Sequence, residues 1–332
     1  MAGTSGLRLC GVFYAFLRRS YDRIMPMIAL VLALALLLSF SPQRSPEEPF
    51  VEVGVWYAGP GVKPPEVPAG DLEAVRRDLA AIRRAGFNGI TTWIAWRDAE
   101  PREGGFALTS LERLVAAAVE ADLKISVVVY DDPVPGWAAS RPGAASQFVA
   151  YLSKRLSLRP GILRVVQQSA ALDAPPARIT VRPGTAPDAR LAMWSQVARG
   201  ARAIAFAGSE TPLPPDLFAL GETAGVITRN QALFAPLRPR NGGVTNISGE
   251  SGGPRVEVRL LESAEALMIV GLNYAPAPRT VTMSFAADIP EAIWQNLETG
   301  TAVSFVMGKT GPSLEYTFGP RDALILMIGK RR

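Results

Sequence analysis

Strand-like and helix-like segments alternate along the chain from residue 51. Residues 51–58, 90–96 and 124–130 are runs rich in β-branched, aromatic and apolar side chains, and residues 72–85 and 111–121 between them place apolar residues at helical spacing. Repeated strand–helix–strand steps predict parallel pairing in an α/β domain. The nearly unbroken apolar strands are typical of a parallel sheet that helices cover on both faces.

Weaker signals continue this pattern as far as residue 240. They predict helices over residues 144–156 and 189–200 and strands over residues 162–168 and 203–207. A closed eight-stranded barrel usually takes about 250 residues, and residues 51–240 are fewer than that. We therefore expect fewer than eight barrel strands in this domain.

The last part of the chain has a different period. Apolar and polar residues alternate strictly over Thr280–Phe285 and again over Leu314–Phe318. Several short alternating runs separated by Gly, Pro and Asn predict antiparallel strands with one buried face. We therefore predict a small β-sandwich-like domain over residues 255–332, after a Gly- and Ser-rich boundary at residues 242–254.

The N-terminal 50 residues have the composition of a targeting segment. Residues 24–43 carry no charge, and the run from Ile28 to Phe40 is strongly apolar, with arginines before it. A basic flank before a short apolar run is the layout of a secretory signal, and the uncharged window just reaches the ~20 residues that a spanning helix needs. Residues 1–50 are therefore predicted to be a signal or membrane anchor with a linker, which makes the protein membrane-anchored or secreted into the cell envelope.

Composition narrows the possible chemistry. The chain has no histidine and one cysteine, Cys10. Catalytic triads with histidine, imidazole metal sites, thiolate clusters and internal disulfides are therefore excluded, and no metal or cofactor is expected. The net charge of +5 arises at the two ends, because residues 1–50 contribute +2 and Lys330–Arg332 contribute +3. A neutral body gives no reason to expect nucleic-acid binding.

Several motifs follow one another in the α/β domain. They are Gly54-Val55-Trp56-Tyr57, Trp93-Ile94-Ala95-Trp96, Glu100-Pro101 with Glu103-Gly104, and Pro135-Gly136-Trp137, and later Arg182-Pro183-Gly184, Trp194 and Ala205-Phe206. In this order they resemble the barrel of family-42-type β-galactosidases and related (β/α)8 glycoside hydrolases. The resemblance is strongest over residues 54–137. It implies an α/β fold of the TIM-barrel type, incomplete in the middle, with a C-terminal antiparallel β domain.

The resemblance also implies an activity, from which the chain departs at two positions. Retaining enzymes of this kind cleave β-galactosides or related carbohydrates with two carboxyl groups about 5–5.5 Å apart. The family carries its acid in an Asn-Glu pair after the fourth strand, and no such pair follows the third strand here. At the place compared with the family's second glutamate stands Val166-Gln167-Gln168, whose amides are poor nucleophiles.

Candidate site residues lie where predicted strands end, because barrels of this type hold their sites at the C-terminal ends of the strands. Carboxylates there suit acid–base chemistry and tryptophans suit stacking on sugars, although both residue types equally suit loops, helix caps or the core. The catalytic candidates are Asp132 and Glu210, and the substrate-binding candidates are Trp96, Arg97, Glu100, Asp131, Trp137 and Trp194.

Three interpretations of the sequence remain open. The protein is a glycosidase with recruited carboxylates, or a non-catalytic, membrane-tethered relative that binds carbohydrate or has a structural role. The third possibility is that a barrel segment has been lost between residues 138 and 165, which would leave an open sheet edge.

Overall fold

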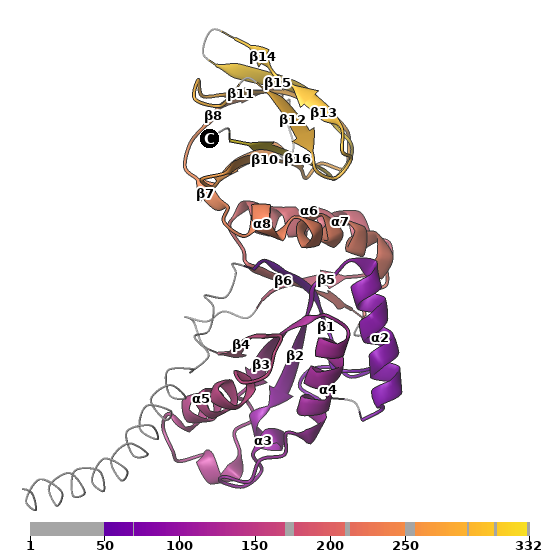
Figure 1. The fold of residues 1–332 in the computed structure, drawn as a ribbon, viewed down its shortest axis with the longest axis vertical. Helices are drawn as coiled ribbons and strands as arrows, with labels where there is room; N and C mark the ends of the chain where they lie inside the picture. Colours follow the sequence, from indigo (N-terminus) through magenta and orange to yellow (C-terminus); the bar gives the residue numbers. More distant parts are fainter. Residues whose placement is uncertain are drawn as a thin grey trace, which may run out of the picture. The chain divides into compact units, whose positions relative to one another are not determined.

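The computed structural model describes residues 50–68, 70–169, 176–209, 213–249, 256–290, 292–308 and 311–330 (Figure 1). The chain divides into two units, Met1–Glu48 and Pro49–Arg332, and the described residues all belong to the second. The uncharged window 24–43 of the predicted signal or anchor lies outside the described residues. Within the ranges given above, no helix is both long and apolar enough to cross a membrane.

The α/β domain is built on one sheet of six parallel strands in the order β4-β3-β2-β1-β6-β5 (Figure 1). The strands are β1 (Glu52–Trp56), β2 (Gly89–Ala95), β3 (Lys124–Tyr130), β4 (Ile162–Gln167), β5 (Ala177–Val181) and β6 (Ala203–Gly208). The predicted first three strands and their parallel pairing are confirmed. Strands β3 and β6 are buried over Val127–Val129 and Ala203–Ala207, which explains the nearly unbroken apolar runs in their sequences.

The strand order leaves β4 and β5 at opposite edges of the sheet. Strands β1 to β4 follow one another outwards from the centre, and β6 and then β5 lie on the other side of β1. Residues 168–176 alone connect the two edge strands. In its described residues the sheet is therefore an open, TIM-barrel-like arrangement, and the expectation of fewer than eight barrel strands is confirmed.

Helices cover the sheet, and two of them approach closely through glycines. The longer helices are α2 (Leu72–Ala85), α4 (Thr109–Glu120), α5 (Ala144–Leu156), α6 (Ala186–Ala198) and α7 (Leu217–Arg229); the short ones are α3 (Trp96–Ala99), η1 (Gly136–Ala138) and α8 (Gln231–Phe234). Helix α2 ends at Gly86, which has a φ of 114°. A Cβ atom added to Gly221 of α7 would lie 2.1 Å from the backbone oxygen of Ala85, so only glycine fits there.

The C-terminal part is a β domain of two antiparallel sheets. One sheet contains β13 (Ala302–Ser304), β12 (Ile293–Asn296), β16 (Asp322–Gly329), β10 (Ala266–Asn273), β9 (Val256–Glu262) and β7 (Arg238–Arg240); the other contains β14 (Val306–Met307), β15 (Pro312–Phe318), β11 (Arg279–Phe285) and β8 (Val244–Ser248). Their inner faces enclose a separate core around Phe285, Trp294 and Phe318. The domain begins before residue 255, because β7 and β8 belong to its two sheets. These two strands carry no signal in the sequence, since they are short and exposed and lack the alternation that marks the later strands.

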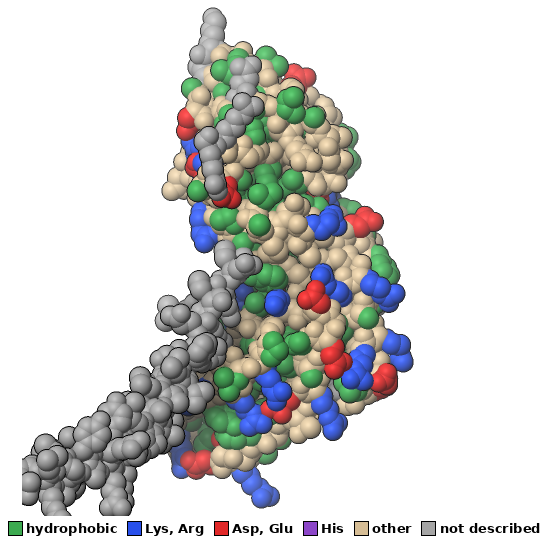
Figure 2. Space-filling model, viewed as in Figure 1, with side chains coloured by type: hydrophobic (Ala, Val, Ile, Leu, Met, Phe, Trp, Pro, Cys, Tyr) green, Lys and Arg blue, Asp and Glu red, His purple; other side chains and the backbone are tan. Residues whose placement is uncertain are grey.

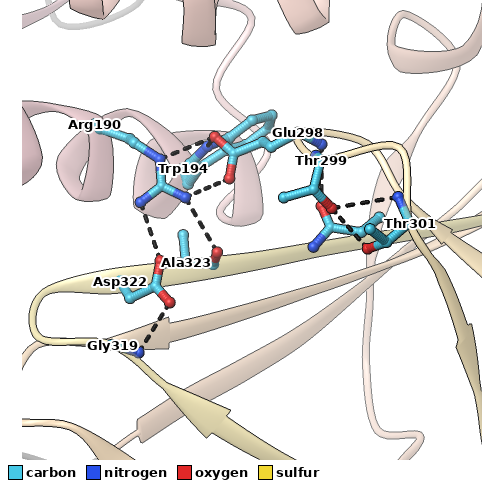
Figure 3. Close-up of polar contacts among 9 residues, drawn as sticks. Arg190, Trp194, Glu298, Thr299, Thr301, Gly319, Asp322 and Ala323 are labelled. Atoms are coloured by element: carbon cyan, nitrogen blue, oxygen red, sulfur yellow. Dashed lines mark hydrogen bonds and ion pairs between the residues drawn. The ribbon is translucent and has the colours of Figure 1, made fainter.

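Helix α6 joins the α/β domain to the β domain. It packs on β5 and β6 and also on β10 and β16, so apolar side chains are needed on two of its faces. Arg190 donates hydrogen bonds to both carboxylate oxygens of Glu298 and to Asp322, and the indole of Trp194 donates to Glu298 at 2.9 Å (Figure 3). These contacts fix the turn between β12 and β13 against α6.

Charged side chains of both signs are mixed on the surface of the α/β domain that Figure 2 shows. Elsewhere in the domain, ion pairs join neighbouring helices, namely Arg76 with Glu120 between α2 and α4, and Arg155 with Glu112 between α5 and α4. Exposed pairs of this kind contribute little to stability. On this face the described residues form no extended region of one sign.

Candidate functional site

A cleft of about 510 Å³ opens beside α3, η1 and α5, next to the C-terminal ends of β2 and β3. We call it the Trp137 cleft. Its lining residues are Glu100, Glu103, Phe106, Trp137, Ser140, Arg141, Pro142, Ala144, Gln147, Phe148 and Tyr151. The cleft thus lies at the end of the sheet where barrel folds hold their sites, and it contains two of the residues that the sequence suggested, Glu100 and Trp137.

Aromatic rings form much of the cleft wall. Phe106 and Tyr151 stack almost in parallel with ring centroids 4.0 Å apart. Trp137 meets the edge of the buried Trp96 at 5.8 Å, and Trp96 in turn stacks on Phe148. Trp137 and Tyr151 are half-buried, so each ring is packed on one side and open on another. Such rings offer rigid apolar area at low entropic cost.

Glu100 holds the cleft loop in place. Its side chain is 6% exposed, and its two carboxylate oxygens accept hydrogen bonds from the Trp96 indole at 3.0 Å and from the Gly104 amide at 2.9 Å. Its backbone oxygen accepts a hydrogen bond from the Trp137 indole at 2.9 Å. Glu100 therefore positions Trp137 through the backbone while its charge is satisfied inside the loop.

Two charged groups lie at the mouth of the cleft. Arg141 forms an ion pair with Glu103, and its guanidinium carbon lies 5.7 Å from the centroid of the Trp137 ring. Both side chains are more than half exposed. Aromatic faces with a few convergent polar groups form the usual composition of a small-molecule site, and here the charged groups can exchange hydrogen bonds with hydroxyls.

The two aspartates after β3 lie in different environments. The Asp131 carboxylate accepts hydrogen bonds from the Gln167 amide and the Ser169 hydroxyl, both at 2.5 Å. Partial burial opposes ionisation, but these two hydrogen bonds hold the pKa of Asp131 below its ordinary value. Asp131 is therefore a stable anion and a poor proton donor. The Asp132 side chain is exposed, and its role in catalysis stays a prediction.

Two of the predicted sugar-stacking tryptophans are in the core. Trp96 is 2% exposed and Trp194 is fully buried. A ring enclosed on both faces cannot stack on a sugar, so the substrate-binding role predicted for these residues is wrong. Trp96 supports the cleft from behind, and Trp194 belongs to the contact with the β domain.

The last two candidates are Arg97 and Glu210, and neither is among the described residues that line the Trp137 cleft. Arg97 is exposed on α3 and lies 3.5 Å from Asp98, so its role in binding substrate stays a prediction. Glu210 lies outside the described residues, so its pairing with Asp132 stays a prediction.

In the sequence the segment Val166-Gln167-Gln168 is compared with the position of the family's second glutamate, but the structure gives it a different place in the sheet. Strand β4 (Ile162–Gln167) pairs with β3 and is the fourth strand along the chain, so these residues stand at its C-terminal end, where the resemblance implies the Asn-Glu pair. The segment before Arg182-Pro183-Gly184 is β5, a strand that the sequence analysis missed. Strand β5 is five residues long, and only the alternation of buried Ile179 and Val181 with exposed neighbours marked it.

One buried acid was also missed. Glu52 on β1 is fully buried, accepts a hydrogen bond from Ser126 at 2.5 Å and lies 3.4 Å from Arg164. Burial raises its pKa to about 7, against the opposing effect of Arg164. Its signal was a single acidic residue in an otherwise apolar strand. Because Glu52 begins β1, it lies at the end of that strand away from the Trp137 cleft.

No protein-family model matches the chain, and no curated protein matches it either. Among solved structures, the chain is similar to the noncanonic maltogenic alpha-amylase AmyB from Thermotoga neapolitana, with a TM-score of 0.50, 11% identity, and coverage of 86% of this chain and 100% of that one. An alpha-amylase from Geobacillus thermoleovorans gives a TM-score of 0.50, 9% identity and coverage of 86% and 97%.

The first structures found cover less of the chain. A GH5_18 protein from Bifidobacterium longum in complex with Manb1-4GlcNAc has 19% identity and a TM-score of 0.30, over 35% of this chain. The chain spans about a third of the length of that protein (32%). At the identities of the two alpha-amylases the likeness concerns the fold alone, which is a TIM-barrel-like α/β domain followed by a C-terminal β domain.

Proposed function

We propose that this protein binds carbohydrate in the Trp137 cleft, on a scaffold of the glycoside hydrolase type. The observation that carries the proposal is the aromatic cleft at the C-terminal ends of β2 and β3, with Trp137 fixed by a hydrogen bond to the backbone of the buried Glu100. Preorganised rings of this kind lose little entropy when a ligand binds.

Aromatic residues of the cleft would contact the apolar face of a sugar, and its charged residues would contact the hydroxyls. The apolar face of a pyranose would lie against Trp137 or the Phe106–Tyr151 stack. Its hydroxyls would exchange hydrogen bonds with Glu103 and Arg141, whose ion pair is exposed and therefore cheap to rearrange. Galactosides are the ligands to test first, because the sequence motifs resemble those of β-galactosidases.

Isothermal titration calorimetry of the full-length protein with lactose and with mannobiose tests this proposal. We expect Trp137→Ala to weaken binding about thirtyfold or more, because removing a central aromatic anchor costs about 2 kcal/mol or more. Phe218→Ala is the control, since Phe218 is 69% exposed on α7 and does not line the cleft. Parent affinity in both Trp137→Ala and Tyr151→Ala would contradict the proposal, because these changes remove the two aromatic platforms of the cleft.

A second candidate is hydrolysis of β-galactosides by a retaining mechanism with Asp132 and Glu210. It is favoured by the adjacent acids Asp131 and Asp132 directly after β3, at the same end of the sheet as the cleft. Cleavage of an aryl β-galactoside that is lost in both Asp132→Asn and Glu210→Gln would support it. Unchanged cleavage in both variants would eliminate this pair. Sugar binding without any cleavage would identify a non-catalytic relative.

We also propose that residues 24–43 hold the protein at a membrane of the cell envelope. The support is the uncharged, apolar sequence after a basic flank. Deletion of residues 1–43 is expected to release the protein from the membrane fraction. Full-length protein in the soluble cytosolic fraction would contradict the anchor.

A further inference from the structure

A second group of polar side chains lies on one face of the parallel sheet. Arg178 of β5 is level with Gly54 of β1, because both residues pair with Ala205 of the strand between them. Trp56, two residues further along β1, therefore faces the same side. The guanidinium carbon of Arg178 lies 5.2 Å from the centroid of the Trp56 ring. The aromatic face thus orients an arginine whose side chain is exposed.

No described carboxylate neutralises Arg178. Among the residues that the structure describes, none lies within the 4.0 Å of an ion pair with its guanidinium. Two acids of the same sheet, Asp131 after β3 and Glu52 on β1, have other partners. Asp131 accepts hydrogen bonds from Gln167 and Ser169, and Glu52 interacts with Arg164. The fork of N–H donors on Arg178 is therefore left for a ligand or for water.

A further donor adjoins this arginine. Trp56 is 95% buried, and its indole nitrogen has no hydrogen-bond acceptor in the described part of the chain. Buried polar groups normally find a partner, so each exception calls for an explanation. Arg178 and the Trp56 indole are therefore two neighbouring donor groups without a described acceptor.

We propose that Arg178, oriented by the Trp56 ring, binds the negatively charged group of an acidic sugar. This inference rests on the carbohydrate-binding function proposed above and narrows its ligand class. A planar guanidinium matches a carboxylate or sulfate through two parallel hydrogen bonds, and such charge-assisted bonds are about twice as strong as neutral ones. A neutral sugar would leave the charge of Arg178 without a counterpart.

Calorimetric titration of the full-length protein tests the inference with matched ligands. The ligands are digalacturonate, its neutral counterpart galactobiose, and galactose 6-sulfate, which separates a carboxylate from a sulfate ester. We expect the preferred acidic ligand to bind more tightly than galactobiose, with an affinity that falls as salt is added. Arg178→Ala should weaken acidic binding about tenfold or more, as expected for hydrogen bonds to a charged group, and leave galactobiose binding unchanged.

Two variants control for charge and geometry. Arg113→Ala removes the same charge from the exposed face of α4 and should leave acidic binding unchanged. Arg178→Lys keeps the charge without the planar fork and should recover only part of the affinity. Acidic ligands that bind no better than galactobiose, or equal losses in Arg178→Ala and Arg113→Ala, would overturn the inference while leaving neutral binding intact. Binding of none of the ligands would overturn the proposed function as well.

Discussion

Glu52 is expected to make the stability of the α/β domain depend on pH. It is fully buried on β1, and burial raises its pKa from 4.5 to about 7 despite the attraction of Arg164 and the hydrogen bonds from Ser126 and Thr91. A pKa difference of this size between the folded and unfolded states corresponds to about 3 kcal/mol, because each unit is worth about 1.4 kcal/mol.

The sign follows from which state holds the proton. Between pH 4.5 and about 7 the folded protein keeps the proton of Glu52 and the unfolded chain loses it. The free energy of unfolding therefore falls as pH rises through this range, by about 3 kcal/mol from this residue, and the loss is complete above the folded pKa. At low pH the neutral carboxyl carries no such penalty.

Glu52→Gln removes the titrating group and keeps a side chain of the same shape that can accept the Ser126 hydrogen bond. Urea unfolding followed by tryptophan fluorescence at pH 4.5 and pH 8 measures the effect. The stability lost between these pH values should be about 3 kcal/mol smaller in the variant than in the parent. Glu222→Gln, at an exposed position on α7, is the control and should behave like the parent. The reasoning is refuted if Glu52→Gln and the parent lose the same stability.

Two further substitutions test the packing by urea unfolding. Gly221→Ala should cost about 2 kcal/mol or more, because the new Cβ meets the backbone oxygen of Ala85, whereas Gly136→Ala, whose Cβ enters open space, should change stability by less than about 0.5 kcal/mol. Equal effects would contradict the close approach of α2 and α7. Glu298→Gln should cost about 2 kcal/mol, because it weakens the charge-assisted hydrogen bonds from Arg190 across the contact of α6 with the β domain. An unchanged unfolding midpoint would contradict that contribution.

The first half of the fold was predictable because each element carries its own signal. Strands β1 to β3 are apolar runs, and α2 has a capping Asp71, a helical stripe and a terminal Gly86. Strand β5 was missed because five residues with two buried positions, Ile179 and Val181, give too short a pattern to recognise. The place of β4 beside β3 was also out of reach, since pairing depends on the whole sheet and not on the strand's own sequence.

The candidate site was predictable only in part. The rule that sites lie after barrel strands led to Glu100 and Trp137, and the structure places both in one cleft. The rule gave no signal for Arg141 or Tyr151, which lie beyond η1 and on α5 and reach the cleft only through tertiary packing. It also misplaced Trp194, because an aromatic residue type does not distinguish a binding surface from a core that another domain covers.

A crystal structure of the protein grown with saturating lactose would show directly whether the Trp137 cleft is a carbohydrate site. We predict a pyranose ring against Trp137 or the Phe106–Tyr151 stack, with hydroxyls within hydrogen-bond distance of Glu103 or Arg141. A sugar bound elsewhere, with the cleft empty, would contradict the account.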